Sequence, residues 1–120
     1  MLFRSLLEKE ALLSALNNSA IVSTADKNGT ITSVNEIFCQ VSGYTQEELI
    51  GQNHNIINSG FHEEVFWKDL WSHILSGKTW RGEICNRSKD GSLYWVDTVI
   101  NPIYDKNGEI YQFQIGRAHV

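Results

Sequence analysis

The sequence predicts an α+β domain built on a five-stranded antiparallel sheet. Segments with the two-residue alternation of strands lie near both ends of the 120-residue chain, and helical patterns lie between them. Short turns containing Asn-Gly or Asp-Gly join neighbouring strand segments, as in antiparallel hairpins. We expect the helices to cover the concave face of the sheet.

The chain begins with an amphipathic pattern followed by the first hairpin. Residues 6–16 place four leucines along one side of a helix: Leu6, Leu12, Leu13 and Leu16. Such a helix packs on a sheet or pairs with a partner helix. Residues 20–26 and 30–35 are then predicted to be paired strands, because a Lys-Asn-Gly turn separates them.

Two short helices are predicted next, over residues 36–41 and 45–50. Thr45 stands at the N-cap position of the second helix, and Glu48 stands three residues later. This spacing is typical of a capping box, in which each side chain binds the backbone of the other residue. A glycine follows each helix and marks its end.

A longer helix is predicted over residues 62–76, and Gly77 ends it. Its apolar residues recur at helical spacing: Phe66, Trp67, Leu70, Trp71 and Ile74. One side of this helix should therefore face the sheet.

The second half of the sheet is predicted to comprise residues 80–87, 93–104 and 109–114. Alternation places Trp80, Ile84 and Asn86 on the inward face of the first of these strands. A buried amide costs free energy unless it forms hydrogen bonds. Asn86 should therefore meet neighbouring backbone or a molecule bound within the fold.

Two motifs resemble a known family. Residues 41–57 read VSGYTQEELIGQNHNII, and residues 80–96 read WRGEICNRSKDGSLYWV. In this order and at this separation they resemble the helical segment and the last hairpin of bacterial Per-Arnt-Sim (PAS) sensor domains. The resemblance covers about residues 17–114. It is greatest to the flavin-binding branch, which includes the aerotaxis receptor and the redox sensor that regulates nitrogen fixation.

The resemblance implies the strand order 2-1-5-4-3 and a ligand cavity between sheet and helices. Six residues are candidate cofactor contacts: Asn35, His54, Asn55, Trp71, Trp80 and Asn86. Trp71 and Asn86 match a tryptophan and an asparagine that the flavin-binding branch uses for its cofactor. Position alone offers other roles: a helix N-cap for Asn35, core packing for Trp71 and Trp80, and loop hydrogen bonds for His54 and Asn55.

The resemblance implies a sensory domain that binds FAD and reports redox state or oxygen to a fused output domain. That output domain would be a histidine kinase, a diguanylate cyclase or a chemoreceptor. Two alternatives stay open: a ligand-free domain that mediates dimerisation and signal relay, and a pocket for a small metabolite or for haem, with His73 as axial ligand. Residues 58–61 read NSGF where the aerotaxis receptor has an RHPD segment that contributes to flavin binding, and residues 53–57 lack the cysteine of photoadduct-forming relatives.

Composition excludes several other classes. The net charge is −4 and the basic residues are scattered, which argues against a nucleic-acid partner. No apolar run approaches the roughly 20 residues that span a bilayer, so we expect no membrane contact. Two cysteines without metal-ligand spacing indicate reduced thiols and a cytoplasmic protein. No nucleophile with a paired base and no phosphate-binding loop is present, so an enzyme is not expected.

The two ends of the chain suggest a further hypothesis. MLFRS at the start and IGRAHV at the end read like translations of the constant adapter DNA used in short-read sequencing. We therefore divide the chain into an N-terminal helix or linker at residues 1–16, whose first five residues would be foreign, a PAS domain at 17–115 and a non-native tail at 116–120. We also expect a homodimer through the N-terminal helix and the outer face of the sheet.

Overall fold

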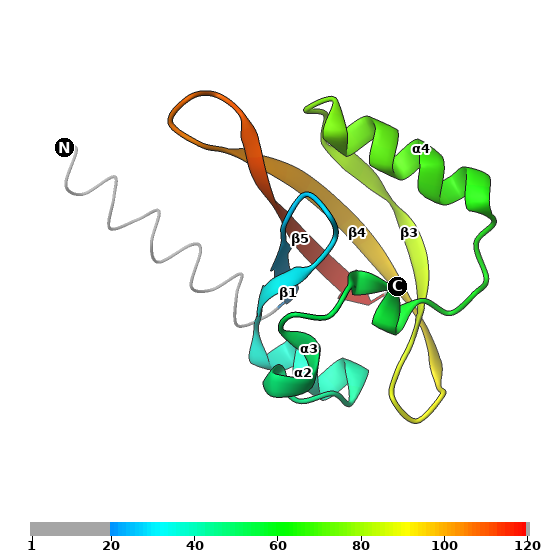
Figure 1. Cartoon of the computed structure of the whole chain (residues 1–120). Helices are drawn as coiled ribbons and strands as arrows, with labels where there is room; N and C mark the ends of the chain where they lie inside the picture. Colours follow the sequence, from blue (N-terminus) through cyan, green and yellow to red (C-terminus); the bar gives the residue numbers. More distant parts are fainter. Residues whose placement is uncertain (1–19, 120) are drawn as a thin grey trace, which may run out of the picture.

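Alternating apolar and polar residues build a five-stranded antiparallel sheet in the computed structural model, which describes residues 20–119 (Figure 1). The strands are β1 (Ile21–Ala25), β2 (Ile31–Val34), β3 (Trp80–Arg87), β4 (Leu93–Tyr104) and β5 (Ile110–His119). Their order in the sheet is β2-β1-β5-β4-β3. The predicted fold class and strand order are therefore confirmed.

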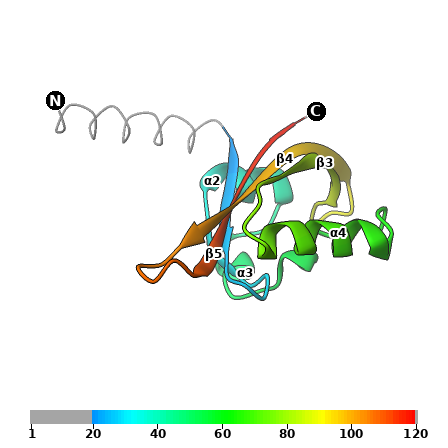
Figure 2. The same cartoon turned by 90° about the horizontal axis from the view of Figure 1, so that it is seen from above.

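Four helical segments connect β2 to β3. They are α2 (Glu36–Ser42), α3 (Gln46–Leu49), the 3₁₀ helix η1 (His54–Ile57) and α4 (Glu64–Leu75). Helix α4 lies along β3 and β4, whereas α2 and α3 lie near β1 and β2 (Figures 1 and 2). Among the residues that the structure describes, no helix is long and apolar enough to cross a membrane.

The predicted capping box of α3 is confirmed. The Thr45 hydroxyl accepts a hydrogen bond from the Glu48 N–H at 3.2 Å, and the Glu48 carboxylate accepts one from the Thr45 N–H at 3.0 Å. Two backbone donors that a helix start leaves unsatisfied are thereby paired. The cap fixes where the chain turns from α2 into the segment that leads to η1.

Two predicted boundaries differ from the structure by more than one residue. Helix α4 begins at Glu64 rather than at residue 62, because the His62 side chain binds the backbone of β3 instead of joining the first helical turn. Strand β5 continues to His119 rather than ending at residue 114, because Ile115 and Arg117 keep the inward alternation and pair with Ile100 and Thr98 on β4. The N-terminal helix predicted at residues 6–16 lies outside the described residues.

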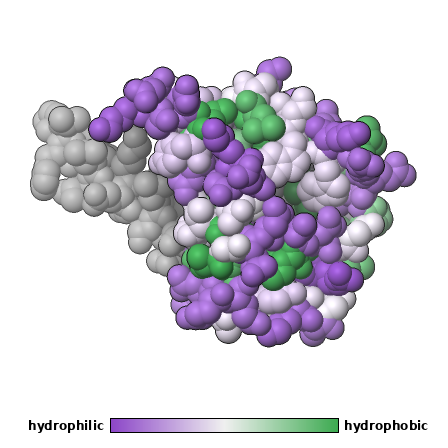
Figure 3. All heavy atoms as spheres, in the orientation of Figure 1, coloured by the Kyte–Doolittle hydropathy of each residue, from purple (hydrophilic) through white to green (hydrophobic). Residues whose placement is uncertain are grey.

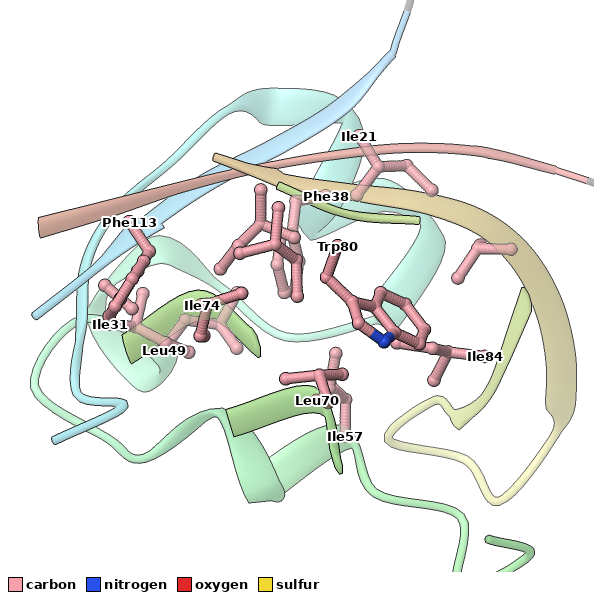
Figure 4. Packing of buried hydrophobic residues seen from close by; sticks show 14 residues of the cluster. Ile21, Ile31, Phe38, Leu49, Ile57, Leu70, Ile74, Trp80, Ile84 and Phe113 are labelled. Atoms are coloured by element: carbon pink, nitrogen blue, oxygen red, sulfur yellow. The ribbon is translucent and has the colours of Figure 1, made fainter. Parts of the chain in front are cut away.

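The core lies between the sheet and the helices (Figure 4). The buried side chains of Val96, Ile100 and Phe113 rise from the sheet, and Leu70 and Ile74 of α4 pack toward them. Apolar burial of this kind is worth about 25 cal/mol for each Å² removed from water. It therefore orients α4 with its apolar stripe toward the sheet.

The two faces of β4 differ as the alternation predicts. Val96 and Ile100 point inward and are at most 6% exposed, whereas Leu93 and Trp95 on the other face are 61% and 39% exposed. The outer face of the sheet thus presents apolar side chains that no helix of the described part covers.

Candidate ligand-binding cavity

A cavity of about 280 Å³ lies between the inner face of the sheet, η1 and α4. Helix α4 contributes side chains spaced by three or four residues: Trp67, Leu70, Trp71 and Ile74. The strands contribute Ile84, Ile100, Phe113 and Ile115. Most of the lining is therefore apolar, as in pockets that hold flat organic ligands.

The cavity lining also includes buried polar side chains. Asn86 on β3 is 4% exposed, and its Nδ2 has no hydrogen-bond partner in the structure. Thr98 on β4 also lines the cavity and is fully buried. A buried amide N–H without a partner costs about 1 to 3 kcal/mol, so this donor favours a ligand that carries an acceptor.

Tyr94 stands opposite Asn86 in the β3–β4 pair. Burial raises the pKa of the Tyr94 hydroxyl, while the charge of Arg117 acts in the other direction. The phenol is therefore neutral at ordinary pH.

His54 lines the cavity wall next to β1. Its Nε2 lies 3.1 Å from the Ser23 hydroxyl, and its ring centroid lies 6.0 Å from that of Phe38. Burial, with a smaller contribution from the charge of Arg117, lowers the pKa of His54 well below its ordinary value. His54 is therefore a neutral hydrogen-bonding group at pH 7.

Arg117 is the one charged residue among those lining the cavity in the described part of the chain. Its guanidinium donates to the Ser23 hydroxyl at 3.3 Å, lies 3.4 Å from His54 Nδ1, and stands 5.0 Å from the centre of the Phe38 ring. All three partners are neutral, and burial lowers the pKa of Arg117 to about 10. Arg117 lies in the tail that we propose to be non-native, so the function proposed below does not depend on it.

The structure brings four of the six candidate residues to the cavity: His54, Asn55, Trp71 and Asn86. Asn35 lies outside the lining. Its side-chain oxygen accepts from the Phe38 and Val22 N–H groups at 3.1 and 3.0 Å, and its amide donates to the Ala20 carbonyl at 2.6 Å. The N-cap role therefore explains Asn35.

Trp80 also lies outside the cavity lining. Its indole is 8% exposed and meets the Phe66 ring at a centroid distance of 5.6 Å. A Cβ added to Gly82 would stand 2.6 Å from the Trp80 ring, so the indole lies directly over this glycine. The Trp-x-Gly pair is thus a packing unit in which glycine makes room for the ring.

Trp71 packs against the core and also lines the cavity. It lines the cavity and meets Phe113 edge to face at 6.1 Å, and its ring lies 3.2 Å from where a Cβ on Gly29 would stand. Gly29 adopts a φ of 83°, which the β1–β2 turn requires. The ring therefore closes one side of the cavity against that turn.

Several lining residues were not among the candidates: Asn53, Asn58, Trp67 and Thr98. Trp67 shares the apolar stripe of Trp71, so helical spacing could have identified it. Nothing in the local sequence separates Asn53 or Asn58 from ordinary loop asparagines. His73, the candidate haem ligand, lies in the last turn of α4 outside the lining, and the described residues include no group of His, Cys, Asp or Glu that could hold a metal ion.

The sheet order, the helices against its inner face and the mainly apolar cavity define an α+β domain of the ligand-pocket class. A family model described as "PAS fold" matches residues 31–115. The chain belongs to the PAS family.

Curated relatives support this assignment. The chain is 32% identical over 95 residues to a nitrogen fixation regulatory protein of Klebsiella pneumoniae, which covers 79% of this chain and 19% of that protein. It is 39% identical over 80 residues to the aerotaxis receptor of Escherichia coli K12, which covers 67% of this chain and 16% of the receptor. The chain thus spans less than a fifth of the length of either relative.

A solved structure from work on a flavin analogue in a light-oxygen-voltage domain is similar in fold. The TM-score is 0.81 at 19% sequence identity, and the match covers 92% of this chain and 84% of that one. At this identity the likeness concerns the fold.

Proposed function

We propose that the chain is a cytoplasmic sensory domain that binds FAD, with the flavin ring in the cavity, and reports redox state or oxygen to a fused output domain. The observation that carries this proposal is the unpartnered Nδ2 of Asn86 in the wall of a mainly apolar cavity. A flavin ring has carbonyl acceptors at one end and an apolar edge at the other. The ring therefore offers an acceptor to Asn86 Nδ2 and an apolar edge to the apolar part of the lining.

The cavity volume agrees with a ring system. Ligand pockets commonly measure about 300 to 1,000 Å³, and this cavity measures about 280 Å³. That space suits one flat ring system rather than an entire dinucleotide. The remainder of FAD would pass the exposed side chains of Asn53 and Asn55, which line the same cavity.

A bound flavin supplies electron-transfer chemistry, and the surrounding residues set how readily it occurs. Asn86 would hold the polar edge of the ring, and Trp67 and Trp71 would exclude water from its faces. Neutral His54 adds no charge beside the ring. Because Asn86 and Tyr94 pair across β3 and β4, a change in hydrogen bonding at the ring would act on these two strands.

The purified domain is expected to be yellow and to show the absorption bands of an oxidised flavin. Dithionite should bleach these bands, and air should restore them. An absorption spectrum before and after each treatment checks the expectation. A colourless protein that also fails to take up added FAD would contradict the proposal and favour the ligand-free domain, and a Soret band would favour haem.

We also propose that the domain forms a homodimer through its N-terminal segment and the outer sheet face. Leu93 and Trp95 are exposed there, and β1 begins beside the same half of the sheet, with Ile21 opposite Arg117 and Arg117 opposite Thr98. By contrast, the face in Figure 3 shows apolar residues in small separate groups. The outer face is therefore the better place for contact between copies.

Sedimentation of the domain with its natural flanking sequence is expected to show a dimer at micromolar concentration. Deleting residues 1–16 should shift the equilibrium toward monomer, because the leucine-bearing segment would be lost. Trp95→Lys should have the same effect, whereas Tyr111→Lys, at a similarly exposed position on β5, serves as the control. A strictly monomeric protein with both flanks present would count against the dimer.

A further inference from the structure

Residues 58–62 close the exposed edge of the sheet next to the cavity. β3 is the last strand in the order, so one side of its backbone has no neighbouring strand. Asn58 forms an isolated antiparallel bridge with Asn86. The Ser59 hydroxyl donates to the Cys85 carbonyl at 2.7 Å, and the Cys85 N–H donates to His62 Nε2 at 2.9 Å. Both outward-facing backbone groups of Cys85 are thereby satisfied.

The bond from Cys85 requires a neutral His62. An imidazole nitrogen accepts a hydrogen bond only when it carries no proton, so the proton of neutral His62 must be on Nδ1. In the imidazolium both nitrogens are donors, and Nε2–H would then face the N–H of Cys85. Protonation therefore replaces an attraction with a repulsion at this contact.

The surroundings of the ring are aromatic. His62 stacks on Phe66 of α4 at a centroid distance of 4.0 Å and an interplanar angle of 14°. Phe61, Trp67 and Trp95 meet it edge-on at 5.1 to 5.8 Å. Aromatic faces attract a cation, which opposes protonation-driven release. Burial acts in the opposite direction, because it disfavours the charged imidazolium, and it lowers the pKa of His62.

Several titratable side chains lie on the segments next to His62. They are Glu63 and Glu64 at the start of α4, Lys68 on α4, Glu83, Cys85 and Arg87 on β3, and Asp97 on β4. Among the described residues none of these side chains forms a hydrogen bond or ion pair with the imidazole. Titration of the contact is therefore a property of His62 itself.

We propose that the 58–62 segment is a pH-sensitive latch on the edge of β3. Neutral His62 holds the latch on Cys85, and protonated His62 releases it and frees the edge beside Asn86. The latch does not depend on a flavin. Its effect on the cavity rests on the proposed function, because Asn86 both pairs with this segment and carries the unpartnered amide.

The sign of the pH dependence follows from linkage. The open latch binds a proton at the ordinary pKa of histidine, about 6.5, and the closed latch binds it only at lower pH. The contact of neutral His62 therefore stabilises the closed latch in full above about pH 7. The latch loses up to about tenfold in its closing equilibrium for each pH unit below 6.5, until the lowered pKa is passed.

Amide hydrogen exchange of the ¹⁵N-labelled domain between about pH 5 and 7.5 tests the latch. After correction for intrinsic exchange, protection of the Cys85 amide should fall below pH 6.5 relative to the Ile31 amide, which donates to the Gln52 carbonyl away from His62. Ile31 reports any global effect of acid, including that of His54. A Cys85 amide whose protection is independent of pH, or follows that of Ile31 throughout, would overturn the latch.

Three variants sharpen the test. His62→Gln retains an acceptor but does not titrate, so protection should persist at acidic pH. His62→Phe removes the acceptor and keeps the ring, so the Cys85 amide should be unprotected throughout. His73→Gln, at the other end of α4, should behave as wild type. A glutamine variant with unchanged pH dependence, or a phenylalanine variant with full protection, would contradict the proposal.

Flavin release separates the two proposals. If the domain binds flavin, release should accelerate below pH 6.5 in wild type and less in His62→Gln. A domain without flavin would refute the proposed function and leave the exchange test of the latch intact. If the domain binds flavin but the exchange protection of the Cys85 amide does not depend on pH, the latch is refuted and the proposed function is not.

Discussion

Replacing Trp80 by alanine is expected to lower the free energy of unfolding by about 3 to 5 kcal/mol, the usual cost of removing a buried large aromatic side chain. The indole is 8% exposed, packs against Phe66 and lies over Gly82. Small domains are stable by only about 5 to 15 kcal/mol, so a large part of the total would be lost. Denaturant unfolding followed by circular dichroism measures the difference.

Gly82→Ala provides a matched test of the same contact. The new methyl group would stand 2.6 Å from the Trp80 ring, and we expect a cost of about 1 to 3 kcal/mol from overpacking. In the Trp80→Ala background the same change should cost almost nothing, because the ring that it meets is absent. Additive effects would contradict the packing unit. A Trp80→Ala variant with normal stability but weak flavin binding would instead indicate that Trp80 contacts the ligand.

Features that depend on neighbouring residues were predictable from the sequence. The capping box needs only Thr45 and Glu48 three residues apart, and the structure contains it. The β3–β4 turn needs Gly91, which adopts a φ of 93°. Alternation along β3 was also sufficient to bury Asn86 among apolar residues. In each case the determining contacts lie within one element or one turn.

Features that depend on distant contacts were not predictable in this way. Trp80 and Asn86 share one face of β3, but they are six positions apart, which separates them by about 20 Å along the strand. One therefore reaches the cavity, and the other packs beyond it against Phe66. Alternation identifies the shared face but does not indicate which part of it remains open.

His62 shows the same limit for a helix boundary. Periodicity placed it in the first turn of the long helix, whereas its Nε2 accepts a hydrogen bond from Cys85, 23 residues later in the chain. Only the completed sheet creates the edge that His62 binds. The helix consequently begins after the histidine, and an edge contact next to the cavity takes the place of a helical turn.

Asn86→Ala is expected to weaken flavin binding about tenfold, which corresponds to the loss of one hydrogen bond worth about 1.4 kcal/mol. Stability of the ligand-free domain should change by less than about 1 kcal/mol. The variant removes a buried N–H group that has no hydrogen-bond partner, which offsets the packing that it loses. Flavin titration and denaturant unfolding of the same preparations measure the two quantities.

Ile84→Ala is the matched control for this change. Ile84 lies two residues earlier on the same face of β3, is 6% exposed and lines the same cavity, but it carries no polar group. Its truncation should cost about 2 to 5 kcal/mol in stability through lost packing. Asn86→Ala should thus mainly lower the affinity for flavin, whereas Ile84→Ala should mainly lower the free energy of unfolding. If Asn86→Ala instead unfolds the domain while its folded fraction binds flavin normally, the amide supports the fold and the cavity must recognise its ligand by other groups.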